Sequence, residues 1–279
     1  MTISSKWVLM LMATACLGCG EGKMDTAGAK DDPIARVPAQ AWEKLASKRI
    51  YFGHQSVGLN IMQGVRDLVA DNPSIRLNVL DLKEGMALGS GGVFAHGPVG
   101  KNQQPATKLD DFRKNIEGES TQGIDIAFLK FCYVDIVETT DVPALVADYK
   151  ARMDELKKRH PGTVFVHLTV PLITDRPSIK NAIKKFLGRG GSECAENIRK
   201  NEYNGILLKE YGGKESVFDL AKIESTRGDG TRVTCTINGK TFFCLNPVYT
   251  DDGGHLNAKG RKVVAAHLLA FLAELAEKN

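Results

Sequence analysis

The sequence predicts an α/β fold with a central parallel sheet of about five strands that helices cover on both faces. Short apolar runs alternate with amphipathic helical patterns from about Val37 to the end of the chain. The apolar runs are nearly continuous, which is typical of strands that are buried on both faces of a parallel sheet. This alternation favours a single α/β domain, and no internal repeat is evident.

The first half of the chain begins the alternation. The run RIYFG at residues 49–53 predicts a short buried strand, and apolar residues at helical spacing predict a helix over residues 57–70. The run IRLNVLDL at residues 75–82 predicts a second strand. The glycine-rich stretch GMALGSGGVFAHGPVGKN at residues 85–102 then predicts a loop.

The second half continues the pattern and adds a β-hairpin before the last loop and helix. Further helices are predicted over residues 107–116, 142–160, 193–211 and 257–278, and further strands over residues 124–131, 163–170 and 216–220. Within RVTCTINGKTFFC, the pair Asn238-Gly239 is a strong hairpin signal. This hairpin would bring Cys235 near Cys244, two residues out of register. Cys194 is a third candidate, so the disulfide pairing stays open.

The N-terminus predicts export. Lys6 precedes the apolar run WVLMLMATACLG, which is too short to span a membrane but is typical of a secretory signal. We therefore expect a signal peptide over residues 1–18, a flexible tether over residues 19–38 and one domain over residues 39–279. Either Cys16 or Cys19 is a candidate for lipidation, which would anchor the protein to a membrane in the periplasm or at the cell surface.

Composition argues against several other classes of protein. The chain has 279 residues, of which 43% are hydrophobic and 25% are charged, as in ordinary globular proteins. Its net charge of +4 is spread along the sequence, so no nucleic-acid-binding stripe is expected. Apart from Cys16 and Cys19 in the predicted leader, the sequence has no CxxC pair, and it has no HExxH motif, which disfavours a structural zinc site.

Two distant stretches suggest a catalytic site. In YFGHQSVGLN at residues 51–60, Ser56 lies at the carboxyl edge of the predicted sheet, where ligands bind in such folds. A serine there is also a preferred helix N-cap. Near the C-terminus, YTDDGGHLNAKG places Asp252 three residues before His255. A base that a carboxylate orients is what a serine nucleophile requires, although the same stretch also fits a polar turn.

This arrangement resembles the SGNH (GDSL-type) hydrolase superfamily, which carries its nucleophilic serine after the first strand and a D-x-x-H string near the C-terminus. The resemblance covers nearly all of the predicted domain, in order, through short motifs. It implies a flavodoxin-like three-layer α/β fold. It also implies that Ser56 is the nucleophile, His255 the general base and acid, and Asp252 the orienting residue, with no metal or organic cofactor.

The first block departs from the family pattern. GHQSVG stands in place of G-D-S-L, and Gln55 precedes the serine as in the G-Q-S-N block of the sialate O-acetylesterase-like branch. No asparagine follows Ser56. Gln55 and His54 are therefore candidates for lining the substrate pocket, and the alternative for His54 is a packed histidine at the end of the strand.

The third block, G-x-N-D in the family, departs further. The stretch FCYVDI places Cys132 at the glycine position and Val134 at the asparagine position, so the usual side-chain donor to the oxyanion is missing. Losing one such donor costs about 2.7–4 kcal/mol of transition-state stabilisation. Lys130 and Asp135 flank the same strand end, where a salt bridge or strand-end solvation explains them as well as substrate binding does.

A substitute donor is predicted in HGPVGKN, after the second strand. His96, Gly100 and Asn102 lie there, and Gly100 could give a backbone N–H while Asn102 gives a side-chain amide. Together with the backbone N–H of Ser56, these groups would complete an oxyanion hole. The alternative is a surface turn punctuated by proline and glycine.

The sequence thus predicts an exported serine esterase. A small-molecule or carbohydrate ester is the expected substrate, and the resemblance implies an acetyl group on a carbohydrate. An O-acetyltransferase or a lipid esterase on the same fold is an alternative. A rival from another class is a non-catalytic binding protein tethered to the cell envelope, which Val134 favours because the oxyanion donor is absent.

Overall fold

The computed structural model of the protein describes residues 32–83, 86, 88–175, 193–237 and 239–278. These residues belong to one compact unit, Asp32–Asn279. The predicted signal peptide, most of the tether, Cys16 and Cys19 lie outside the described residues, as does the side chain of Cys194.

A parallel sheet of six strands forms the centre of the described chain, in the order β2-β3-β1-β4-β5-β6. The strands are β1 (Arg49–His54), β2 (Val79–Asp81), β3 (Val93–Pro98), β4 (Ile126–Leu129), β5 (Val164–Leu168) and β6 (Val217–Phe218). Without the short edge strand β2, this order is the flavodoxin-like order 2-1-3-4-5. The predicted fold class is therefore confirmed, with one strand more than expected.

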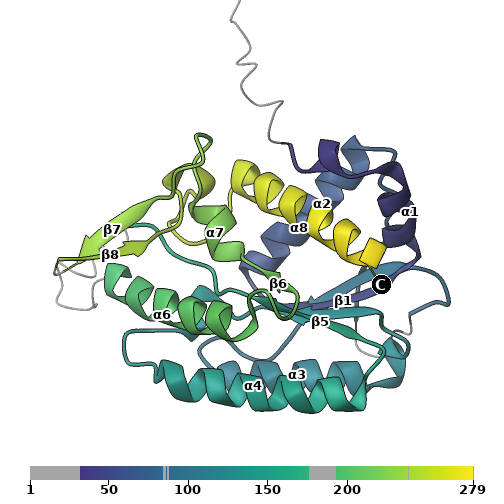
Figure 1. Ribbon diagram of the computed structural model, residues 1–279, viewed down its shortest axis with the longest axis horizontal. Helices are drawn as coiled ribbons and strands as arrows, with labels where there is room; N and C mark the ends of the chain where they lie inside the picture. Colours follow the sequence, from purple (N-terminus) through teal and green to yellow (C-terminus); the bar gives the residue numbers. More distant parts are fainter. Residues whose placement is uncertain (1–31, 84–85, 87, 176–192, 238, 279) are drawn as a thin grey trace, which may run out of the picture. The chain divides into compact units, whose positions relative to one another are not determined.

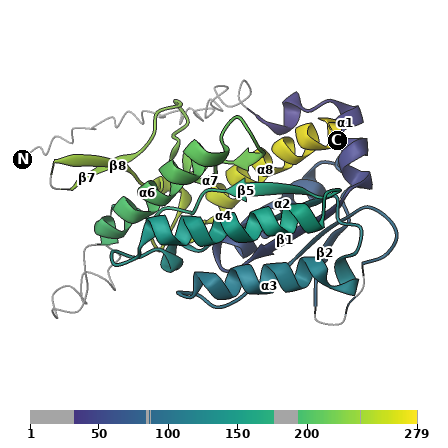
Figure 2. The same cartoon turned by 60° about the horizontal axis from the view of Figure 1, so that its bottom comes forward.

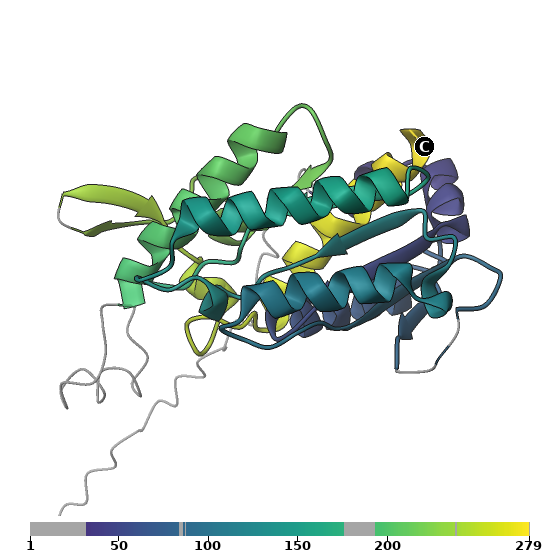
Figure 3. The ribbon, with the colours of Figure 1, turned by 90° about the horizontal axis from the view of Figure 1, so that it is seen from below.

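Helices cover both faces of this sheet (Figure 1). The helices are α1 (Ala39–Ser47), α2 (Val57–Asp71), α3 (Pro105–Glu117), α4 (Val142–Arg159), α6 (Glu193–Tyr211), α7 (Leu220–Ser225) and α8 (Ala258–Lys278). Helices α1, α2, α7 and α8 share one hydrophobic core, and α3, α4 and α6 share the other. Figure 2 shows α3 and α4 in front of the strands, and Figure 3 shows the same two helices from below.

The alternation of side chains along β1 explains why the sheet needs two covers. Ile50 and Phe52 pack into the core beneath α2 and α8, whereas Tyr51 packs into the core beneath α3. All three side chains are fully buried. Because successive residues of a strand point to opposite faces, a continuously apolar strand must be covered on both sides.

The prediction for residues 75–102 was wrong in its placement of the second strand. Only Val79–Asp81 of the predicted strand pairs, at the edge of the sheet, and β3 lies within the predicted glycine-rich loop. The apolar run of β3 is short and is flanked by glycines, so the sequence pattern did not indicate a strand there. Gly92 has a packing role there, because an added Cβ would lie 1.9 Å from the backbone oxygen of Ala46.

The folded part begins earlier than the predicted boundary at residue 39. A short 3-10 helix, η2 (Ile34–Arg36), precedes α1, and Ile34 and Val37 pack against the core. Three more 3-10 turns lie at η3 (Glu119–Thr121), η4 (Tyr133–Asp135) and η5 (Pro247–Tyr249). Among the helices in the described part of the chain, none is long and apolar enough to cross a membrane.

The predicted hairpin forms between α7 and η5. Its strands, β7 (Thr234–Ile237) and β8 (Lys240–Phe243), pair antiparallel and project beyond the main sheet in Figure 1. Cys235 lies opposite Phe242, so Cys244 is two residues out of register, as predicted. The structure closes a disulfide between Cys235 and Cys244, which resolves the pairing that the sequence left open.

Candidate active site

Ser56 occupies a sharp turn between the carboxyl end of β1 and the start of α2. Its backbone has a φ of 53°, which residues other than glycine rarely adopt. Its hydroxyl makes no capping bond to α2, so the expectation that Ser56 also caps this helix was wrong. Strain of this kind at the end of a central strand is typical of functional sites, because the surrounding structure must hold it in place.

The hydroxyl of Ser56 instead faces a histidine 199 residues further along the chain. Ser56 Oγ lies 2.6 Å from Nε2 of His255, and Nδ1 of His255 lies 2.6 Å from Oδ2 of Asp252. The three side chains therefore form a continuous chain of hydrogen bonds. In this arrangement, Asp252 would hold the imidazole ring of His255 so that Nε2 can accept the proton of Ser56.

The carboxylate of Asp252 also organises its own loop. Its Oδ1 accepts hydrogen bonds from the backbone N–H of Gly254 at 2.9 Å and of His255 at 2.8 Å. Partial burial alone would raise the pKa of Asp252, but these two N–H groups and the imidazole outweigh it and hold this pKa at about 2. Asp252 is therefore ionised at neutral pH, as the predicted orienting role requires.

Two residues that the sequence analysis missed hold this loop over Ser56. Asn60, one turn into α2, accepts a hydrogen bond from the backbone N–H of Leu256 at 3.2 Å. The ring of Tyr133 lies edge-on to His255, with a centroid separation of 5.6 Å, and packs against Gly254. An added Cβ at Gly254 would lie 2.7 Å from the Tyr133 ring, so glycine is required for this approach.

Asn60 and Tyr133 each had a weak signal in the sequence. Asn60 is a polar residue within the otherwise apolar first turns of the helix, and Tyr133 lies between the glycine and asparagine positions of the third block. Neither signal specified a contact with the histidine loop, because that contact depends on packing between distant parts of the chain.

The third-block residues form a buried network rather than an oxyanion donor. Asp135 binds Nζ of Lys108 at 2.5 Å and accepts hydrogen bonds from the backbone N–H of Cys132 and of Gln103. Lys108 and Asp135 are both buried. Asp135 therefore forms a salt bridge, and its partner is Lys108.

The end of β4 also buries a lysine and a thiol. Nζ of Lys130 donates to the backbone oxygen of Phe131 and lies 3.4 Å from Sγ of Cys132. Burial is the main cause that lowers the pKa of Lys130. Sγ of Cys132 in turn lies 3.5 Å from the backbone oxygen of Gln55, so this thiol supports the nucleophile turn from below.

The predicted oxyanion role of Gly100 needs correction. Its backbone N–H donates to Oδ2 of Asp111 at 2.8 Å and therefore faces α3. Asn102 accepts a hydrogen bond from Lys108 at 2.9 Å and is exposed. Gln55 does not present its amide to a ligand either, because Nε2 donates to the backbone oxygens of Val99 and Gly100. Gln55 thus ties the β3–α3 loop to the nucleophile turn.

A cavity of about 670 Å³ opens beside Ser56. Its walls come from the ends of β1, β2 and β3 and from the first turn of α2, and they are formed by His54, Gln55, Ser56, Leu59, Asp81, Leu82, Lys83, His96, Gly97 and Pro98. Three of the predicted pocket residues, His54, Gln55 and His96, therefore line a cavity with the serine. Neither Gly100 nor Asn102 is among the lining residues.

The two histidines of this wall are packed against each other. Nε2 of His54 lies 2.9 Å from Nδ1 of His96, and Nε2 of His96 lies 3.1 Å from Oδ1 of Asp81. His54 and His96 are each only 1% exposed. Gly58 makes room for His54, because an added Cβ there would lie 2.4 Å from it. His54 is thus both a packed histidine and a wall of the cavity.

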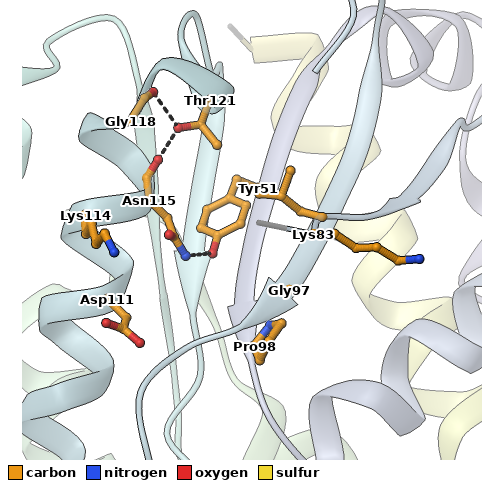
Figure 4. A pocket seen from close by; sticks show the side chains of 10 residues that line it. Tyr51, Lys83, Gly97, Pro98, Asp111, Lys114, Asn115, Gly118 and Thr121 are labelled. Atoms are coloured by element: carbon orange, nitrogen blue, oxygen red, sulfur yellow. Dashed lines mark hydrogen bonds between the residues drawn. The ribbon is translucent and has the colours of Figure 1, made fainter. Parts of the chain in front are cut away.

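A second cavity, of about 390 Å³, lies on the α3 side of the same strands (Figure 4). It shares Leu82, Lys83, Gly97 and Pro98 with the first cavity and does not reach Ser56. In Figure 4, the amide of Asn115 points to the hydroxyl of Tyr51, and the two groups lie 2.6 Å apart. We therefore take the cavity that Ser56 lines as the candidate substrate pocket.

Comparisons with known proteins give structural neighbours only. Neither a protein-family model nor a curated protein matches the chain. A protein described as a GDSL-like lipase from Parabacteroides merdae is 12% identical, with a TM-score of 0.47 over 81% of this chain and 95% of that one. A protein described as an SGNH hydrolase from Slackia heliotrinireducens is 14% identical, with a TM-score of 0.42 over 80% and 97%.

A third similar structure is a mutant of an acetylxylan esterase from Geobacillus stearothermophilus, at 10% identity and a TM-score of 0.41 over 81% of this chain and 94% of that one. Several similar structures are described as SGNH- or GDSL-type proteins, the family that the motifs around Ser56 and His255 resemble, and two others are described as acyltransferases. At these identities the likeness concerns the arrangement of the chain, and the chemistry must follow from its own residues.

The buried histidine pair predicts that stability falls in acid. Burial is the main cause that lowers the pKa of His54 to about 2 and that of His96 to about 4, from an ordinary value of 6.5. Below about pH 6.5 the unfolded chain binds protons that the folded protein excludes. The free energy of unfolding should therefore be steady above about pH 7.5. It should fall from there toward pH 4, by up to about 1.4 kcal/mol per pH unit for each histidine.

Urea unfolding between pH 7.5 and pH 5 measures this dependence. His96→Gln, which replaces one titrating ring of the pair by an amide, should flatten the decline. An equal decline in the wild type and in His96→Gln would contradict the assignment of the acid sensitivity to this pair.

Proposed function

We propose that the protein is an exported serine hydrolase that cleaves carboxylic esters through Ser56, His255 and Asp252. The 2.6 Å contact between Ser56 Oγ and His255 Nε2 is the observation that carries this proposal. A non-catalytic binding protein would not require a contact between a serine hydroxyl and an oriented histidine. In an esterase, the contact supplies the base that the weakly nucleophilic hydroxyl needs.

The proposed reaction has two halves. Ser56 Oγ attacks the ester carbonyl while its proton passes to Nε2 of His255. As the tetrahedral intermediate collapses, the imidazolium returns this proton to the departing alcohol and leaves an acyl group on Ser56. Water, deprotonated by His255, then attacks the acyl-enzyme, and the carboxylic acid leaves as Ser56 regains its proton. Asp252 stabilises the imidazolium throughout, because its carboxylate is held ionised beside Nδ1.

The oxyanion of this reaction needs hydrogen-bond donors. The backbone N–H of Ser56 lies at the N-terminus of α2, where the helix dipole also favours negative charge. The side-chain amide of Asn102 remains our proposal for a second donor, now without Gly100. The contact with Lys108 uses Oδ1 of Asn102, so Nδ2 is the atom that would donate to the oxyanion.

Export and a lipid-anchored N-terminus remain part of the proposal on the strength of the sequence, and an acetylated carbohydrate is the substrate that the family resemblance implies. The reaction needs no cofactor, since the acid, base and nucleophile all come from the chain. An O-acetyltransferase would use the same acyl-enzyme with a sugar hydroxyl in place of water. A tethered binding protein without turnover is the rival, and the aligned serine, histidine and aspartate argue against it.

Labelling with a fluorophosphonate probe tests the proposed nucleophile. The purified protein should form one adduct on Ser56, located by peptide mass spectrometry, because the base activates only this hydroxyl. Asp252→Asn should keep the fold and slow labelling and ester turnover by roughly 10³–10⁴-fold, because it favours the wrong tautomer of His255. Folded protein that stays unlabelled at high probe concentration would favour the binding protein instead.

Substitution of Asn102 tests the oxyanion proposal. Asn102→Ala should lower kcat by about 10²-fold or more, with little change in KM, because an oxyanion donor acts chiefly in the transition state. Gln103→Ala, an adjacent substitution on the same loop, is the matched control. Turnover of Asn102→Ala equal to that of the control would remove Asn102 from the site.

A further inference from the structure

The cavity beside Ser56 lies on one side of the nucleophile only. Its lining residues come from β1, α2 and the segments around β2 and β3. None of them belongs to the loop of Asp252 and His255, and none follows β4. The nucleophilic oxygen therefore has the histidine on one side and this cavity on another.

The two sides of a catalytic serine receive different parts of an ester. His255 must protonate the departing alcohol, so the alcohol lies on the histidine side. The acyl group stays on Ser56 and must extend elsewhere. Accepting the proposed hydrolase, we infer that the cavity between Leu59, Leu82 and Pro98 binds the acyl chain. In place of the acetyl group that the resemblance implies, the protein would then prefer apolar acyl groups of about four to eight carbons.

Most polar residues of the wall are directed toward protein partners; besides Asp81, Lys83, which is exposed, is the other charged residue that lines the cavity. His54 and His96 bond to each other, and the amide of Gln55 is taken by backbone oxygens. Asp81 is paired with Arg66 at 2.7 Å and lies beside His96. What these residues leave for a ligand is chiefly ring and aliphatic surface, which suits an alkyl chain better than a sugar.

Leu59 is the second observation that indicates an apolar ligand. It is one turn after Ser56 on α2, lines the cavity and is 58% exposed. Leu59, Phe243 and Val248 are the large hydrophobic side chains found exposed among the described residues, and Leu59 alone of these lines this cavity. An alkyl chain in the cavity would cover Leu59 and remove apolar surface from water.

The size of the cavity sets the expected chain length. A volume of about 670 Å³ lies within the range of roughly 300–1,000 Å³ that is usual for small-molecule sites. An acetyl group has a single methyl beyond the carbonyl and would leave most of this space unfilled. Each further methylene that is buried should raise kcat/KM about fourfold until the cavity is full.

A series of p-nitrophenyl esters, from acetate through butyrate and hexanoate to octanoate, tests this inference because only the acyl group varies. The wild type should show a ratio of kcat/KM for hexanoate over acetate of at least tenfold. Leu59→Asp should lower this ratio by tenfold or more. Val248→Asp is the matched control, because it places the same charge at a side chain that is 53% exposed and does not line the cavity, and its ratio should match the wild type.

A second readout does not depend on turnover. The rate of labelling of the wild type by alkyl fluorophosphonates should rise with the length of the alkyl chain in the same way. A preference for acetate, or equal ratios in Leu59→Asp and Val248→Asp, would overturn the acyl-chain assignment and leave the hydrolase intact. Absence of both ester hydrolysis and labelling would instead overturn the hydrolase, and the acyl-chain assignment with it.

Discussion

The packing of α8 against α2 is the contact on which the site depends. The two helices approach closely at Gly64, where an added Cβ would lie 2.4 Å from the backbone oxygen of Arg261. This approach brings the loop that precedes α8 over the turn that precedes α2, and so places His255 within 2.6 Å of Ser56. Residues 199 positions apart in sequence thus meet because two long apolar helices share one face of the sheet. The strained backbone of Ser56 can persist because the elements that flank it, β1 and the inner face of α2, are buried and hold it in place.

Sequence patterns predicted this arrangement at the level of elements. The apolar strands and amphipathic helices fixed the fold class, and the serine after the first strand and the D-x-x-H string marked the two halves of the triad. The patterns failed where side-chain pairing decides the outcome. Nothing in HGPVGKN indicates that Asp111, eleven residues beyond Gly100, takes its amide, and nothing in FCYVDI indicates that Lys108 neutralises Asp135. Strand β3 was not predicted, because its short apolar run lies among glycines and has no clear period.

Residues 132–135, at the place of the third block, stabilise the site instead of donating a hydrogen bond to the oxyanion. At the place of the family's asparagine this chain has Val134, and its neighbours bind the protein rather than a substrate. Cys132 reaches the backbone of Gln55, Asp135 is buried with a lysine, and Tyr133 holds the histidine ring. The nucleophile and its base are therefore rigidly placed, while the stabilisation of the oxyanion depends on fewer preformed donors. Such a site favours a substrate whose remote part binds well, and an acyl chain bound in the cavity next to Ser56, as we propose, would provide that binding.

The proposed chemistry requires His255 to activate Ser56 for attack on a carbonyl. A crystal structure of the protein after reaction with a hexyl fluorophosphonate would reveal this activation, because the adduct imitates the tetrahedral intermediate. Phosphorus should be bonded to Ser56 Oγ, with a phosphonyl oxygen within hydrogen-bonding distance of the Ser56 backbone N–H and with His255 Nε2 still beside Oγ. An unmodified Ser56 in folded protein, or an adduct on another residue with His255 turned away, would contradict the proposed activation.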